Sequence, residues 1–92
     1  MYEILPYTEL QANRLGVRVT TSKNPSKKID VFDWNGNFIC SVGAKGYGDY
    51  PTYLKLNGKE YADERRRLYK IRHQKDRKII GSKGYYADNL LW

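Results

Sequence analysis

Two mainly apolar runs flank an Asn-Gly pair in the first half of the chain. Residues 29–34 and 37–42 are rich in β-branched and aromatic side chains, which favour strands. Between them, Asn35-Gly36 is typical of a two-residue type I′ turn, because both central residues of that turn need a positive φ. The pattern predicts a β-hairpin.

A third strand is predicted over residues 15–21, where the apolar residues Leu15, Val17 and Val19 alternate with polar ones. Residues 20–26 are typical of a turn because they contain an Asn-Pro pair. With the hairpin, this strand completes a three-stranded antiparallel meander, which is close to the minimum for a stable sheet.

The order of charged residues over residues 59–74 predicts the main helix. Acidic residues lie near its start and basic residues near its end, as the helix macrodipole favours. We expect it to pack on the sheet, so the predicted fold class is α+β with one main helix on a small three-stranded antiparallel sheet. Its expected inner side consists of Tyr61, Ala62, Leu68, Tyr69 and Ile71.

The remaining segments show no clear period. Residues 1–14, with Pro6 in their middle, are predicted to be an extended N-terminal arm. Residues 43–58 are rich in Gly and Tyr and contain Pro51, so we expect a loop with no helix running through it. Residues 85–92 are compatible with a short final helix, and we expect Trp92 to pack on the sheet or on a partner. A single domain then covers residues 15–92.

Charge is concentrated in one part of this 92-residue chain. The chain carries 17 Lys and Arg against 10 Asp and Glu, a net charge of +7. Residues 65–78 hold eight basic residues and one acidic residue, so this run carries the whole net charge. Such a charge points to phosphate, anionic lipid or an acidic protein surface as the partner.

The basic run supplies the strongest candidates for partner binding, with either an acidic protein surface or a phosphate backbone as the target. Arg66, Lys70, His73 and Arg77 recur at helical spacing and would form one outer stripe if the helix continues that far. A solvated helix face is the alternative interpretation. The full set of candidates is Arg65, Arg66, Arg67, Lys70, Arg72, His73, Arg77 and Lys78.

Nine tyrosines and two tryptophans are the second feature of the composition. These residue types are enriched at protein interfaces, and they also stack on unpaired bases. The plainest alternative is that they fill the edge of a thin core. No RRM signature, KH loop or zinc-finger spacing supports sequence-specific nucleic-acid readout. The candidate aromatic anchors are Tyr47, Tyr50, Tyr53, Tyr85, Tyr86 and Trp92.

Few residues are suited to catalysis. His73 is the only histidine and lies among arginines, and Cys40 is the only cysteine and lies among apolar strand residues, where it is typical of a buried small side chain. One cysteine excludes an internal disulfide and a Cys/His zinc cluster, and no apolar run is long enough to span a membrane. We expect no enzymatic activity, cofactor, metal, small-molecule substrate or membrane association.

Four motifs occur in order along the chain: residues 28–36 with the Asn-Gly pair, residues 42–50 with Gly-Tyr-Gly-Asp-Tyr, residues 63–73 ending in Arg-His, and residues 84–92 ending in Leu-Leu-Trp. Together they resemble a family of small uncharacterised proteins encoded by tailed phages and large eukaryotic DNA viruses. The likeness covers about residues 15–92. It departs from the family at Val42, where Phe is usual, and at residues 51–59, which look like an insertion. The resemblance implies a viral origin and a place in the virion.

The resemblance implies a virion structural protein, and we expect a minor capsid or cement protein that bridges capsid subunits. Its expected partners are the major capsid protein or other virion proteins, and it would be made in the host cytoplasm and end in the virion. The alternative is a DNA-binding protein without sequence specificity that neutralises the viral genome. A small inhibitor of a host enzyme is a third class that the sequence leaves open.

Overall fold

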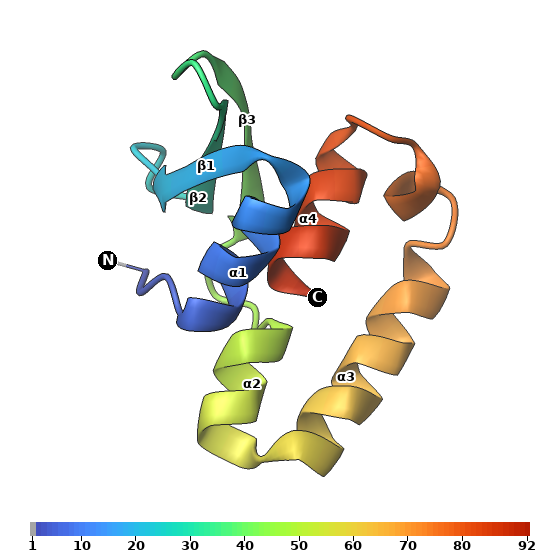
Figure 1. Ribbon diagram of the computed structural model, residues 1–92. Coiled ribbons are helices and arrows are strands. Elements are labelled where there is room, and N and C mark those ends of the chain that lie inside the picture. Colours follow the sequence, from blue (N-terminus) through green and yellow to red (C-terminus); the bar gives the residue numbers. More distant parts are fainter. Residues whose placement is uncertain (1) are drawn as a thin grey trace. The chain divides into compact units, whose positions relative to one another are not determined.

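The computed structural model describes residues 2–92, which form two compact units. The N-terminal unit ends at Tyr47, and the C-terminal unit is Gly48–Trp92. Within residues 2–47 one helix, α1, accompanies three strands, and the C-terminal unit is helical (Figure 1). The predicted α+β class with a three-stranded antiparallel sheet is confirmed. The boundary predicted between residues 14 and 15 stays a prediction.

The sheet has the strand order β1-β2-β3, and both strand pairs are antiparallel. Its strands are β1 (Val17–Thr21), β2 (Lys27–Asp33) and β3 (Phe38–Ala44). The central strand β2 places the fully buried side chains of Ile29 and Val31 on one face. Val42 and Cys40 lie opposite them on β3 and are also buried. Cys40 is therefore a small core residue, as predicted.

The hairpin between β2 and β3 is present, but its predicted type I′ turn is wrong. Only Gly36 has a positive φ, of 90°. The Asp33 N–H donates to the Asn37 carbonyl oxygen, and the Gly36 N–H donates to the Asp33 carbonyl oxygen, which gives a three-residue loop ending on a left-handed glycine. The Asp33 carboxylate accepts hydrogen bonds from the N–H groups of Asn35 and Asn37. This side chain selects the longer turn because it satisfies the N–H groups of the loop.

Asp30 is a buried carboxylate in the middle of β2. It accepts hydrogen bonds from the hydroxyls of Ser22 and Ser41, both at 2.5 Å, and from the N–H of Lys23 at 3.2 Å. Burial raises the pKa of this carboxyl, but these hydrogen bonds outweigh the burial and hold the pKa below its ordinary value. Asp30 thus ties the β1–β2 turn and strand β3 to the central strand.

The segment predicted to be an extended arm contains helix α1 (Pro6–Leu15), which packs on β1. Pro6 starts the helix, where its missing N–H and fixed φ are tolerated. Gly16 ends it in the left-handed conformation, with φ 71°, and its N–H caps the carbonyls of the last turn. The prediction of an extended arm was wrong because Pro6 was taken as a helix breaker and not as a first-turn residue.

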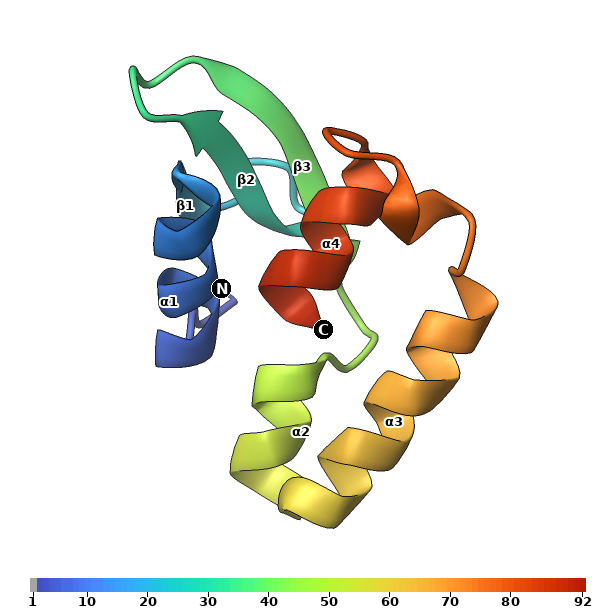
Figure 2. The same ribbon diagram turned by 45° about the vertical axis from the view of Figure 1, so that its right-hand side comes forward.

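The C-terminal unit is built from helices. In Figure 2, α2 and α3 form a helical hairpin that turns at Gly58. A 3₁₀ turn, η1, follows α3 and packs against the last helix, α4. The elements are α2 (Tyr50–Asn57), α3 (Lys59–Arg72), η1 (Asp76–Lys78) and α4 (Lys83–Leu91).

Helix α2 was not predicted, because residues 43–58 were expected to form a loop. Its first turn holds Pro51, and the Asp49 carboxylate caps it by accepting a hydrogen bond from the Thr52 N–H at 3.0 Å. An Asp followed by a first-turn Pro is a start signal for a helix. Gly48 precedes this cap, and the Tyr53 ring lies so close to it that an added Cβ would come within 2.2 Å of the ring.

Helix α3 covers most of the predicted range 59–74. Ala62 and Tyr69 of its predicted inner side are buried, and Leu68 is half-buried. Tyr61 and Ile71 are instead 46% and 58% exposed, which corrects their predicted place on the inner side. That α3 packs on the sheet stays a prediction. None of the helices in residues 2–92 is long and apolar enough to cross a membrane.

Replacing Asp30 by Asn should lower the free energy of unfolding at pH 7 by about 1–3 kcal/mol, because a buried, charge-assisted acceptor is lost. The pKa of Asp30 in the folded chain lies below the ordinary value of 3.8. The contribution of the Asp30 charge to the free energy of unfolding is therefore complete above the unfolded-state pKa, and it is lost as the pH falls through the folded-state pKa. The difference in the free energy of unfolding between the wild type and Asp30→Asn should therefore become smaller below about pH 4.

Urea unfolding at several pH values measures this gap. The control is Glu9→Gln, which removes an exposed carboxylate from the same unit and should change stability by less than about 0.5 kcal/mol. An Asp30→Asn gap of equal size in acid and at neutral pH would contradict the assigned role of the charge.

Candidate functional site

The basic run begins on α3, where the first two arginines lie against tyrosines of α2. The Arg66 guanidinium lies over the Tyr50 ring, 3.4 Å from its centroid, and the Arg65 guanidinium lies 5.7 Å from the Tyr53 centroid. Both arginines are half-buried, so these cation–π contacts are partly desolvated and hold α2 against α3. Tyr50 and Tyr53, predicted as partner anchors, are thereby engaged within the unit.

Tyr50 also bonds to the first turns of α3. Its hydroxyl donates to Asp63 at 3.0 Å, and Lys59 donates to the other oxygen of the same carboxylate at 2.6 Å. Burial and then the hydrogen bond to Asp63 raise the pKa of Tyr50. The hydrogen bonds from Lys59 and Tyr50 lower the pKa of Asp63. This cluster holds the start of α3 against the start of α2.

Further along α3, Lys70 points towards α4. Its ammonium group donates to Asp88 at 2.6 Å, and the two side chains are only 31% and 10% exposed. Arg77 contributes to the same region, since its Nε donates to the Lys70 carbonyl oxygen at 3.3 Å. These bonds join α3, the segment after it and α4.

An aromatic stack closes the end of α3. The Trp92 ring lies on Tyr69, with centroids 4.3 Å apart and planes 9° apart, and His73 stacks on Tyr69 at 4.3 Å. Burial, and then the charge of Asp88, raises the pKa of Tyr69 to about 12. Trp92 is therefore packed down, as predicted, but on Tyr69 of α3.

The predicted outer stripe of Arg66, Lys70, His73 and Arg77 does not form. Helix α3 ends at Arg72, and His73 stacks on Tyr69 in the last turn of that helix. Arg66, Lys70 and Arg77 contact other parts of the C-terminal unit. They therefore help to hold the unit together, whereas the outward part of the basic run consists of other residues.

The outward cations lie in the second half of α3 and beyond it. Arg67 is exposed and pairs with Glu64 on the same helix. Arg72, Lys75 and Lys78 are exposed, and across residues 2–92 none of them forms an ion pair. Arg72 and Lys78, which were predicted to bind a partner, therefore remain available to one. The neighbouring Lys75, which was not in the predicted set, is available as well.

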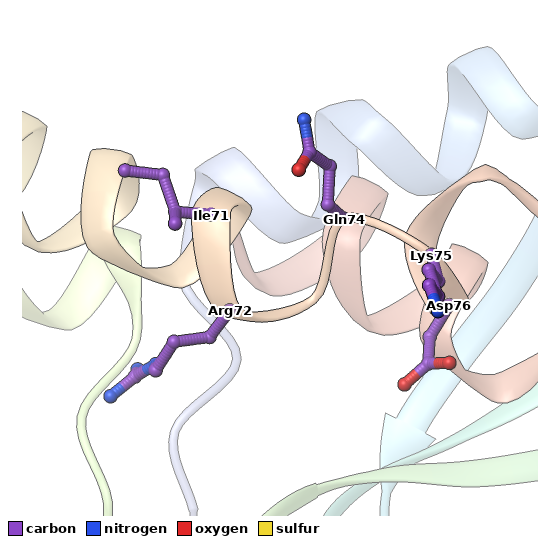
Figure 3. A pocket seen from close by; sticks show the side chains of 5 residues that line it. All are labelled: Ile71, Arg72, Gln74, Lys75 and Asp76. Carbon is purple, nitrogen blue, oxygen red and sulfur yellow. The ribbon is translucent and has the colours of Figure 1, made fainter.

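A shallow hollow of about 330 Å³ lies among these outward residues. Figure 3 shows the side chains that line it, which come from the end of α3 and the turn that follows. Arg72 and Asp76 point to one side of the chain, and Gln74 to the other. The lining residues are Ile71, Arg72, Gln74, Lys75 and Asp76.

Three isoleucines are exposed in the same stretch of chain. Ile71, Ile79 and Ile80 are 58%, 60% and 83% exposed. We call residues 71–80, with these isoleucines and the cations Arg72, Lys75 and Lys78, the docking segment. The sequence pattern did not identify the isoleucines as a site, although an Ile pair directly after a basic run is the signal that marks them.

The other predicted anchors are placed differently. Tyr47 is 77% exposed, and Tyr85 and Tyr86 are half-buried and form an edge-to-face pair on α4. In the described part of the chain, no group of three or more His, Cys, Asp or Glu residues is arranged to hold a metal ion. The arrangement exposes cations and apolar side chains next to one another in the chain.

Comparison of the chain with protein-family models, with curated proteins and with solved structures finds no match.

Two single substitutions separate the inward from the outward part of the basic run. Lys70→Gln should lower the free energy of unfolding by about 2–3 kcal/mol, because it leaves the nearly buried Asp88 carboxylate without its cation. Arg67→Gln removes one cation from an exposed pair and should cost less than about 1 kcal/mol. Denaturant unfolding of both variants measures the difference, and equal losses would show that Lys70 is not held inside the unit.

Proposed function

We propose that the chain is a non-catalytic binding protein of a DNA virus particle, a minor capsid or cement protein that bridges larger capsid subunits. In this proposal the docking segment, residues 71–80, binds an acidic and partly apolar surface of a capsid protein. The viral setting is supported by the ordered motifs that resemble small proteins of DNA viruses. The mode of binding is supported by the side chains that the docking segment exposes.

The observation that carries the proposal is the combination of exposed isoleucines with exposed cations that form no ion pair within residues 2–92. Ile79 and Ile80 are 60% and 83% exposed, and burying a branched apolar side chain contributes about 1.5–3 kcal/mol. A protein surface can cover such side chains, and acidic residues at its rim can pair with Arg72, Lys75 and Lys78. Protein interfaces combine these two kinds of contact.

Binding to the phosphate backbone of packaged DNA is the alternative. It would use the same cations and would weaken steeply with salt, with a slope of about −0.9 per phosphate neutralised. It gives the exposed isoleucines no apolar partner, however, because the duplex backbone presents charged oxygens and sugars. The mixed chemistry of the segment therefore favours a protein.

The proposal predicts that the protein stays at a fixed ratio to the coat protein when particles of the encoding virus are emptied of DNA and washed in moderate salt. Quantitative mass spectrometry of full and emptied particles measures this ratio. Loss of the protein together with the DNA would support the phosphate-binding alternative and overturn the proposal.

Substitutions then locate the contact. Changing both Ile79 and Ile80 to Ser should reduce occupancy on particles by about tenfold or more at limiting protein, since each tenfold corresponds to about 1.4 kcal/mol. The matched control is Leu56→Ser, which alters an equally exposed apolar side chain of the same unit, 70% exposed.

For the cations, Lys75→Glu with Lys78→Glu should reduce occupancy on particles, whereas Lys55→Glu should not. Equal occupancy of test and control variants would exclude the docking segment as the contact.

A further inference from the structure

The N-terminal unit carries an exposed aromatic cluster on the outer face of its sheet. Arg18 of β1 lies opposite Phe32 of β2, and Phe32 lies opposite Phe38 of β3, so the three side chains cross the sheet on one face. Trp34, two residues after Phe32, extends the row to the hairpin turn. We call Arg18, Phe32, Trp34 and Phe38 the aromatic–arginine cluster.

The members of the cluster contact one another. The Phe32 and Phe38 rings meet edge to face, with centroids 5.8 Å apart, and the Arg18 guanidinium lies over the Trp34 ring at 4.9 Å. Trp34 and Phe38 are nevertheless 58% and 59% exposed. Two large rings thus remain open to solvent while their neighbours hold them in place.

The local backbone keeps these rings on the outside. A register irregularity between Val31 and Phe32 leaves Val31 in the core and Phe38 opposite Phe32 on the outer face. The Asp33 carboxylate holds the turn through Asn35 and Asn37. Since the opposite face supplies the core through Ile29 and Val31, the cluster is not an extension of the core.

We propose that the aromatic–arginine cluster is a second docking surface, for a protein partner that offers an apolar pocket with a carboxylate at its rim. Trp, Phe and Arg are enriched at the centres of protein interfaces. Trp34 and Phe38 would enter the pocket, and Arg18 would bind the carboxylate. Among residues 2–92 Arg18 forms no ion pair.

The charges around the cluster favour an acidic protein over nucleic acid. The two carboxylates of β2 are already engaged, because Asp30 accepts from Ser22 and Ser41 and Asp33 accepts from the turn. In this proposal the carboxylate that pairs with Arg18 comes from the partner. A site for single-stranded nucleic acid combines stacking rings with a groove of several cations, whereas this cluster contains one.

This surface extends the proposed function, since a protein that bridges two subunits needs two binding surfaces. It lies on the N-terminal unit, whereas the docking segment lies on the C-terminal unit. The two surfaces are tested by different residues, so either can fail without the other.

The test uses the full chain, labelled with ¹⁵N, and defined probes. A short peptide of alternating Glu and Leu should shift the indole N–H signal of Trp34, whereas a peptide of alternating Lys and Leu should bind several-fold more weakly. The indole of Trp92, stacked on Tyr69 in the other unit, should stay unchanged and reports that the fold is intact. Trp34→Phe assigns the two indole signals.

Charge reversal makes the test specific. Arg18→Glu should reverse the preference between the two peptides, so that the Lys-Leu peptide binds better than the Glu-Leu peptide. The control is Lys23→Glu, at an exposed site in the β1–β2 turn of the same unit, which should leave the preference for the Glu-Leu peptide unchanged. Phe38→Ala should weaken binding of the Glu-Leu peptide several-fold without moving the Trp92 signal. No shift of Trp34 with either peptide, or an unaltered preference in Arg18→Glu, would overturn the proposal. A shift produced only by single-stranded oligothymidylate would replace the protein partner with nucleic acid.

Discussion

The ion pair between Lys70 and Asp88 is the interaction on which the C-terminal unit depends most. A carboxylate that is 10% exposed needs a cation, and Lys70 supplies it from α3, 18 residues earlier in the chain. Tyr69, the preceding residue, then carries the stack with Trp92. Once Lys70 faces α4, helix geometry directs Arg66, one turn earlier, to the inner side as well, where it meets Tyr50. The rest of the basic run is left to solvent or to a partner.

The strand and main-helix patterns were strong enough to predict the sheet and α3, because alternation and helical spacing report which side is buried. The hairpin turn was wrong in detail because the Asp33 side chain, and not the Asn-Gly pair alone, decides the loop. Helices α1 and α2 were missed for one shared reason. Pro6 and Pro51 were taken as breakers, although a proline in the first turn of a helix is favourable.

The sequence located the stretch of chain that carries the net charge, and its role as a binding site stays a prediction. The inward and outward residues of this stretch could not be separated from the sequence. That separation depends on Asp88 and Tyr50, which lie far from the basic run in the sequence and meet it only in the folded unit. The exposed residues Ile79 and Trp34 were missed because apolar side chains in a short chain are expected to fill its core. The basic run thus supplies both contacts inside the folded unit and cations that are exposed to solvent.

The rates at which lysines are acetylated, measured on the free protein and on the protein bound to particles, test this division most directly. The structure predicts slow acetylation of Lys70, whose side chain is 31% exposed and bonded to Asp88, and fast acetylation of the exposed Lys75 and Lys78. The proposed function predicts that on particles Lys75 and Lys78 become protected while the exposed Lys55 keeps its rate. A Lys70 that reacts as fast as Lys75 in the free protein, or a Lys75 and Lys78 that stay fully reactive on particles, would contradict the account.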